Sequence, residues 1–378
     1  MTEHARRNPF RALLSTWPLI ATALTLSLLG VLTMSHFDGT SSLASRQFIW
    51  IGIGLVVYAL CALMDMRFIR RSQVIIAGYV IAVVLLAVLM VVGHTTMGAK
   101  SWFSFGLFAF QPADFAKLVM IALLAKYFSR RHMEMGNFTH ILISGVYASA
   151  VIILVLVQPD LGTAVILMTV WFGLVLVSGI PLRHLAVVSL GALVLAAGLW
   201  SFGLKEHQRQ RIMTFVNPAA DIRGTGYNAY QATIATGSGQ FWGKGIGYGT
   251  QSKLRFLPEY QTDFIFAAFA EEWGFVGVVL LLLLYGFLFF QLLSIARRSA
   301  TNFDALFTIG VIILFLAHVG FHAGINLGLL PVTGTTIPFM SSGGSHVVME
   351  FAALGIIASL AQQGRSVPRE QAMREYEG

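Results

Sequence analysis

The feature that most restricts the fold of this chain is a series of long apolar windows separated by short polar turns. Each window has roughly the 17 to 25 residues that a helix needs to cross a hydrocarbon core of about 30 Å. A backbone in lipid must satisfy its own hydrogen bonds, so such windows predict helices. We therefore predict an all-α, polytopic membrane protein with about ten transmembrane helices, at 18–36, 47–66, 73–93, 113–129, 139–157, 162–180, 184–202, 264–295, 304–329 and 345–363.

The composition agrees with a membrane protein. Hydrophobic residues fill 56% of the 378 positions and charged residues 11%, and the mean hydropathy is +0.75; soluble domains are far more polar. The first window follows three arginines, but no small-residue cleavage site comes after it, so we interpret it as a retained helix. Cys61 is the only cysteine and lies within a window, which argues against a disulfide framework or a thiolate metal cluster.

The distribution of basic residues predicts the orientation in the membrane. Arginines collect in the termini and short loops of one side, whereas the short loops opposite hold only Arg46 and Lys100. By the positive-inside rule, both termini are cytoplasmic. The expected organisation is a single integral membrane domain at 1–363 in a bacterial cytoplasmic membrane, followed by a cytoplasmic tail at 364–378. The net charge of +8 then reflects topology and not a nucleic-acid partner.

A polar, glycine-rich loop of about 60 residues, 203–263, separates the seventh and eighth windows on the predicted outer side. Loops of this length in compact proteins are usually functional or disordered. Its aromatic residues argue against disorder. It carries seven Lys and Arg residues, and cations such as Arg209, Arg211 and Lys244 suit a phosphate or diphosphate. Alternatively, they contact anionic lipid headgroups.

The glycines of this loop do not form a nucleotide site. In GSGQFWGKGIGYGT, five residues separate Gly237 from Gly243, where the nucleotide-binding motif has four, and Gly245 stands where a Ser or Thr is required. No nucleotide cofactor is expected.

Ionisable residues within spans mark function or paired structure. Asp114 and Lys117, in QPADFAK, lie three residues apart on one helical face. They form a self-neutralising salt bridge, or Lys117 lies close enough to an outward cavity to meet an anionic substrate group. Gln111 and Pro112 mark the start of this helix.

Other polar residues in the spans have simpler explanations. Asp160 or Thr163 is expected to cap the helix that follows the QPD turn. His318 and His322 have the i, i+4 spacing of a two-histidine metal site, but no carboxylate completes it nearby, which favours a packed or hydrogen-bonded pair. Glu350 stands alone in the last window, and the sequence assigns it no role.

Asp263 starts the eighth window after a polar turn. A carboxylate at the outer interface of the membrane, in contact with water on one side only, can act as a general base. Alternatively, Asp263 only caps a long helix, a common role for Asp. Glu271, eight residues further along, is expected on the same helical face, and Glu271 or Glu272 is expected to be buried and paired or protonated.

Several motifs together resemble one family of membrane proteins. They include GAKSWFSFG around Trp102, QPADFAK, QPDLGTA, GYNAYQATIATGSG, GTQSKLRFLPE, TDFIFAAFAEEWG and INLGLLPVTGTTIPFMSSGGS, in this order along nearly the whole chain. The chain is similar to the SEDS family (shape, elongation, division and sporulation), and GTQSKLRFLPE favours its elongation-type branch. Departures include Asp114 where the family usually has Glu, Gln261 in place of a usual His, and Ser342 in place of a usual Tyr.

The resemblance implies a peptidoglycan glycosyltransferase that polymerises lipid II on the outer face of the cytoplasmic membrane. It implies Asp263 as the catalytic base, an inverting reaction, and substrate contacts from Trp102, Gln111, Asp114, Lys117, Arg209, Arg211 and Lys244. A divalent cation, Mg or Mn, is an optional cofactor. Expected partners are lipid II, membrane lipid, a class B penicillin-binding protein and the elongation machinery.

Two alternatives to an enzyme remain at this stage. A lipid II flippase or other transporter would need a midplane site built from discontinuous helices. Here the polar residues gather toward the predicted outer end, which favours one-sided chemistry. A non-catalytic scaffold of the elongation machinery would leave Asp263 as a helix cap.

Overall fold

The computed structural model describes residues 16–35, 42–96, 99–105, 108–131, 137–198, 200–201, 206–216, 226–254 and 256–363. All ten predicted windows are helical within these ranges. The helices are α2 (Trp17–Ser35), α3 (Ser42–Leu63), α4 (Ser72–Val92), α5 (Pro112–Arg131), α6 (Phe138–Val157), α7 (Leu161–Val177), α8 (Leu182–Gly198), α12 (Ile265–Arg297), α13 (Asn302–Asn326) and α14 (Gly344–Gln363). The tail predicted at 364–378 lies outside the described residues.

Seven helices in the described ranges are long and apolar enough to cross a membrane: α2, α3, α4, α6, α12, α13 and α14. The other three predicted spans differ for identifiable reasons. Helices α7 and α8 have 17 residues each, close to the lower limit for a span. Helix α5 carries Asp114, Lys117 and Lys126 and is therefore less apolar. The polytopic helical fold is confirmed.

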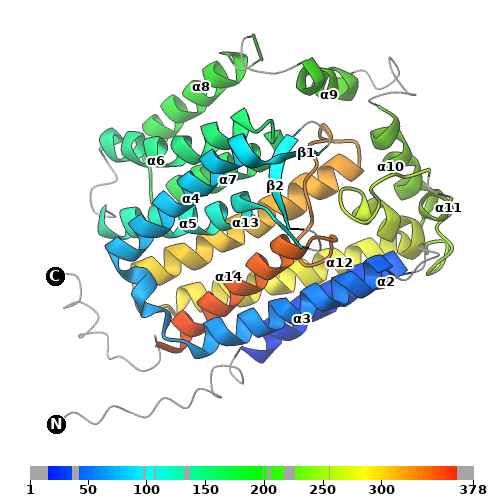
Figure 1. Ribbon diagram of the computed structural model, residues 1–378, viewed down its shortest axis with the longest axis horizontal. Coiled ribbons are helices and arrows are strands. Elements are labelled where there is room, and N and C mark those ends of the chain that lie inside the picture. The colour runs from blue at the N-terminus through cyan, green and yellow to red at the C-terminus, as the bar shows by residue number, and fades with distance from the viewer. Residues whose placement is uncertain are drawn as a thin grey trace.

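The long helices run side by side in one bundle (Figure 1). Helix α14 packs along α3, α12 lies against both α2 and α13, and α5 contacts α4 and α13. Apolar side chains at successive turns of α4 point outward, as expected for a lipid-facing stripe: Ile76, Val80, Val84, Val88 and Val91. The core is filled by the inward faces of the helices, with large buried side chains such as Phe128, Phe307 and Phe351.

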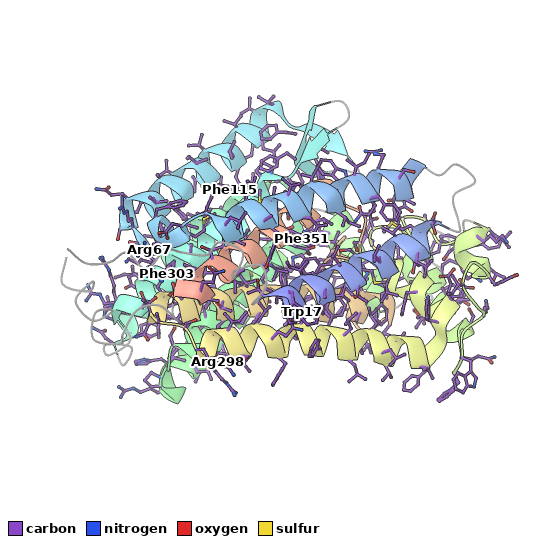
Figure 2. All side chains as sticks on the ribbon, turned by 90° about the horizontal axis from the view of Figure 1, so that it is seen from below. Trp17, Arg67, Phe115, Arg298, Phe303 and Phe351 are labelled. Atoms are coloured by element: carbon purple, nitrogen blue, oxygen red, sulfur yellow. The ribbon has the colours of Figure 1, made fainter. Side chains whose placement is uncertain are left out.

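Shorter elements gather near one end of the bundle. The loop before α12 contains α9 (Glu206–Val216), α10 (Tyr227–Ser238) and α11 (Thr250–Lys253); α10 packs against α12. Figure 2 places Arg67 and Arg298 at the end of the bundle away from α10 and α11. A 3-10 helix, η1 (Met66–Arg70), joins α3 to α4.

A small antiparallel sheet, which the sequence analysis did not predict, precedes α5. Its strands are β1 (His94–Thr96), β2 (Ala99–Phe105) and β3 (Phe108–Phe110), in the order β1-β2-β3. Trp102 pairs with His94, and Phe103 with Phe110. The sheet fixes the position of Trp102 relative to the start of α5.

Candidate active site

Asp263 lies in the turn before α12. The N-cap residue is Phe264, with no side-chain capping bond, so Asp263 does not occupy the N-cap position. Asn326 of α13 contacts this helix start. Its Oδ1 accepts a hydrogen bond from the Ala267 N–H at 3.1 Å, while its Nδ2 donates to the Asp263 carbonyl at 3.0 Å. One N–H of the first helical turn is thereby satisfied from another helix.

The Asp263 carboxylate faces the segment 331–343 that links α13 to α14. A Cβ added at Gly334 would lie 3.5 Å from Asp263 Oδ2, and Gly334 has φ +71°, a conformation that favours glycine. Backbone without a side chain therefore approaches the carboxylate closely. Two hydrogen bonds hold this segment beside the turn: Ser341 Oγ donates to the Thr262 carbonyl at 2.9 Å, and the Ser342 N–H donates to the Gln261 carbonyl at 2.8 Å.

Trp102 lines a pocket of about 180 Å³, which we call the tryptophan pocket. Its lining is Arg46, Gln47, Trp50, Trp102, Ala109, Ser342, Gly343 and Gly344. Indole faces and a guanidinium are surfaces that can stack on a ring and bind an anion. Arg46 is also one of only two cations that the sequence places in the short outer loops. Ser342 of the pocket lining is hydrogen-bonded to Gln261, which lies two residues before Asp263 in the sequence. The pocket is therefore connected to the turn that carries Asp263.

Gln47 shapes one wall of the tryptophan pocket. Its Nε2 donates to the Ser341 carbonyl at 3.2 Å, and its Oε1 accepts from the Gly343 N–H at 3.3 Å. A single buried amide from α3 therefore fixes the chain that enters α14. This role could not be predicted from the sequence, because Gln47 lies at a helix start among polar residues.

Asp114 and Lys117 form the predicted salt bridge. Lys117 Nζ lies 3.0 Å from Asp114 Oδ1, and both side chains are almost fully buried. Ser345 Oγ donates to Asp114 Oδ2 at 3.0 Å and accepts from the Gln111 N–H at 3.3 Å. Gln111 also reaches Asp160 Oδ2 through its Nε2, at 3.4 Å. Gln111, Asp114 and Lys117 are thus brought together.

The cavity beside Lys117 is small. Its volume of about 20 Å³ is enough for one water molecule. Lys117 Nζ also lies 3.4 Å from His318 Nε2. Its substrate contact stays a prediction.

The two histidines of α13 are hydrogen-bonded, as expected. His318 Nδ1 lies 2.9 Å from the Thr336 carbonyl, and His322 Nδ1 lies 2.8 Å from the Thr335 carbonyl. In the described part of the chain, no group of three or more His, Cys, Asp or Glu residues is placed to hold a metal ion.

Asp160 is the N-cap of α7, as expected. Its Oδ1 accepts from the Thr163 N–H at 3.0 Å. Burial raises the pKa of this carboxyl above its ordinary value, and the hydrogen bonds from Thr163 oppose that shift.

Lys244 is paired with Glu271, which holds the outer loop on α12. Lys244 Nζ lies 2.7 Å from Glu271 Oε1, and Glu271 is fully buried. Thr250 Oγ1 and the Gln251 N–H also donate to Glu271. Glu272 accepts from the Gly247 N–H at 2.7 Å. The expectation that Glu271 shares a helical face with Asp263 is wrong, because α12 begins only at Ile265.

Arg209 and Arg211 both lie in α9. An Nη of Arg209 donates to the Ser201 carbonyl at 2.9 Å, so this residue ties α9 back to the segment after α8. Arg211 belongs to α9, and its side chain lies outside the described part of the structure.

Comparisons with known proteins agree with this arrangement. The profile of a family described as cell cycle proteins, FtsW, RodA and SpoVE, matches residues 8–366. The chain belongs to this family. It is 37% identical over 286 residues to peptidoglycan glycosyltransferase MrdB of Escherichia coli (strain K12), covering 75% of this chain and 76% of the relative. It is 32% identical over 331 residues to stage V sporulation protein E of Bacillus subtilis (strain 168), covering 87% and 89%.

Solved structures of the FtsW, RodA and SpoVE family share the fold. A crystal structure of the rod shape determining protein RodA of Thermus thermophilus has a TM-score of 0.68 at 29% identity, covering 92% of this chain and 96% of the other. A chain from a study of polymerization and crosslinking by a peptidoglycan synthase complex has a TM-score of 0.78 at 30% identity, covering 93% and 98%. The SEDS fold and the resemblance to RodA are confirmed.

Sequence reasoning missed two buried residues near Lys117, His346 and Glu350. His346 Nε2 lies 2.8 Å from Glu350 Oε1, and His346 Nδ1 lies 3.4 Å from Asp114 Oδ1. The available signal was the spacing of four residues on one helix, which puts both side chains on the same face.

Proposed function

We propose that this protein is a peptidoglycan glycosyltransferase that polymerises lipid II into glycan strands on the outer face of the bacterial cytoplasmic membrane during cell elongation. One observation carries the proposal within this family. Asp263 is placed in the turn just before α12, beside the glycine backbone of segment 331–343, and not at the N-cap position of that helix.

In the proposed reaction, Asp263 takes the proton from a sugar hydroxyl of the acceptor. The hydroxyl oxygen attacks the anomeric carbon of the donor, with inversion, and the bond from that carbon to the lipid diphosphate breaks. The electron pair leaves with the diphosphate. General-base catalysis of this kind contributes roughly 10²- to 10⁴-fold to a rate.

The tryptophan pocket is the proposed binding site for part of the substrate. We assign Trp102 and Arg46 to a sugar ring and a neighbouring anionic group. Lys244 keeps an accessible edge, with 29% of its side chain exposed, and can meet a diphosphate while bound to Glu271. Gln111, Asp114, Lys117, Arg209 and Arg211 stay proposed contributors of hydrogen bonds or positive potential. A divalent cation would accompany the diphosphate and not reside in the protein.

The proposed orientation places both termini in the cytoplasm and α10 and α11 outside. It is supported by the basic residues at the opposite end, such as Arg67 and Arg298 (Figure 2). We further propose a class B penicillin-binding protein as partner, alongside the elongation machinery. An apolar stripe on α12 suits a partner's transmembrane helix or surrounding lipid: Leu280, Leu283, Phe287 and Phe290.

The test is glycan polymerisation from labelled lipid II by the purified protein with its penicillin-binding partner. Asp263→Asn is expected to reduce the rate by roughly 10²- to 10⁴-fold without changing thermal melting or partner binding. The matched control is Asp65→Asn, an acidic residue paired with Arg67 at 2.6 Å at the other end of the bundle. It should polymerise like the wild type.

Equal rates for Asp263→Asn and the wild type would remove the base assignment. Absence of glycan from a folded, partner-bound wild type would favour the transporter or scaffold alternatives. A lipid II translocation assay in vesicles then separates those two.

A further inference from the structure

Four buried side chains form one network between α5 and α14: Asp114, Lys117, His346 and Glu350. Asp114 bonds Lys117 at 3.0 Å and lies 3.4 Å from His346 Nδ1. His346 Nε2 lies 2.8 Å from Glu350 Oε1. Every member is less than a tenth exposed. Charges this deeply buried require partners, because their separation from water is costly.

The contacts of His346 suit the protonated form of its ring. Ionised carboxylates only accept hydrogen bonds, and each ring nitrogen of His346 faces a carboxylate. A ring protonated at both nitrogens is a cation, and in that state two negative and two positive charges cancel within the network.

His318 orients Lys117 from the other side. Its Nδ1–H donates to the Thr336 carbonyl at 2.9 Å, because a carbonyl can only accept. Its Nε2 consequently offers a lone pair to Lys117 Nζ at 3.4 Å. The ammonium is held between Asp114 and His318.

The same network fixes the segment that faces Asp263. Glu350 Oε2 accepts from the Phe339 N–H at 2.7 Å, and His346 Nε2 lies 2.8 Å from Thr336 Oγ1. Phe339 has φ +63°, a conformation that a bulky residue keeps only where its surroundings enforce it. Gly334, at the other end of this stretch, lies against the Asp263 carboxylate.

We propose that His346 and Glu350 are positioning residues for the reaction. They hold Asp114, and through it the Lys117 ammonium, and they hold segment 334–339 beside Asp263. This inference rests on the proposed function, and it assigns neither residue a contact with substrate. A purely structural ion pair would contribute to stability alone.

The first test variant is the pair His346→Ala with Glu350→Gln. It removes one positive and one negative charge together, so the remaining Asp114–Lys117 pair stays balanced. We expect kcat for lipid II polymerisation to fall roughly 10- to 100-fold, as small displacements in an active site can do, with KM unchanged. Amide hydrogen exchange at Phe339 should accelerate.

Rescue distinguishes positioning from structure. Adding Asp114→Glu to this variant lengthens the carboxylate arm by one methylene, into the space left by the imidazole ring. We expect the triple variant to recover most of the lost kcat. The matched control removes a partly buried ion pair, Arg70→Gln with Asp304→Asn, whose partners lie 2.7 Å apart at the opposite end. It should lower thermal stability but leave kcat unchanged.

Wild-type kcat in the double variant would overturn the inference. So would a triple variant that folds but stays as slow as the double variant. If the double variant does not fold, the kcat of the folded triple variant is compared with the wild type instead. Activity in the triple variant supports the inference, and an inactive folded triple variant overturns it. A wild type that makes no glycan contradicts the proposed function instead, and the exchange rate of Phe339 then tests the network independently.

Discussion

At the scale of single residues, several buried charges in the described part of the chain have partners from distant parts of the sequence, such as Asp304 with Arg70 and Glu271 with Lys244. Asp114 stands where the family usually has Glu, so its arm is one methylene shorter. Ser345 and His346 of α14 approach the shorter carboxylate. The sequence indicated the Asp114–Lys117 pair because the two residues are neighbours on one helix. It did not indicate His346, because that contact joins residues 232 positions apart.

The Lys244–Glu271 pair gives a prediction at this scale. Lys244→Met leaves the buried Glu271 carboxylate without its cation, although Thr250 and Gln251 still donate to it. We expect the free energy of unfolding to fall by about 1–3 kcal/mol. Hydrogen exchange at the Gln251 amide should also accelerate.

Lys253→Met is the control for this change. Lys253 is exposed, and its Nζ lies 6.0 Å from the centre of the Tyr248 ring. Its melting temperature and exchange should match the wild type. Equal stability of the two variants would show that the Lys244 pair does not hold the loop.

At the scale of elements, α12 combines a membrane span with a docking site for the outer loop. Its 33 residues extend for about 50 Å at 1.5 Å per residue, longer than a hydrocarbon core of about 30 Å. Gly274 breaks the helical geometry with φ 63° and ψ −166°. The Phe275 and Val276 N–H groups donate to the carbonyls of Gln240 and Phe241, and the loop donates back to Glu271 and Glu272.

Gly274→Ala should therefore undo this docking. A Cβ at position 274 would collide with the Gly243 nitrogen, and alanine is strained in this conformation at a cost of about 1–3 kcal/mol. We expect a lower melting temperature and faster amide exchange at Phe275 and Val276. Polymerisation should weaken, because the loop carries Lys244.

Gly286→Ala in the same helix is the matched control. Nothing lies within 4 Å of a Cβ at this position. Alanine there should be neutral or stabilising by roughly 0.5–1 kcal/mol, as in other helix interiors. If both variants melted alike, the kink at Gly274 would not be what docks the loop.

At the scale of the whole molecule, the bundle separates its functions between two ends. The short elements α10 and α11 lie toward one end, whereas Arg67 and Arg298 lie at the other (Figures 1 and 2). This asymmetry predicts the orientation in the membrane. In a Cys61→Ser background, Trp242→Cys should react with a membrane-impermeant maleimide added to intact cells.

Arg298→Cys should react only after the membrane is opened, because the positive-inside rule places that end in the cytoplasm. Trp242 is 77% exposed, so burial would not limit its labelling. Labelling of Arg298→Cys in intact cells would reverse the topology and contradict the proposed outer site.

The helices and the acidic residue at the start of α12 were predictable from sequence for a physical reason. Membrane spans are set by local apolar length, and helix pairs such as Asp114–Lys117 or caps such as Asp160 depend on residues within one turn. The expectation that Asp263 and Glu271 share a helical face was wrong because α12 begins only at Ile265. The contact of Asn326 with the Asp263 carbonyl, between residues 63 positions apart, had no local signal.

The amino-acid sequence by itself determined the all-helical membrane architecture, the long loop before α12 and the family, since these follow from apolar length, from charge distribution and from ordered motifs. Only the tertiary structure decided which polar groups meet. It joined Trp102 to Arg46 in one pocket, Lys244 to Glu271, and His346 to Asp114. Buried polar groups need partners, but the helix that supplies each partner is chosen by packing of the whole bundle.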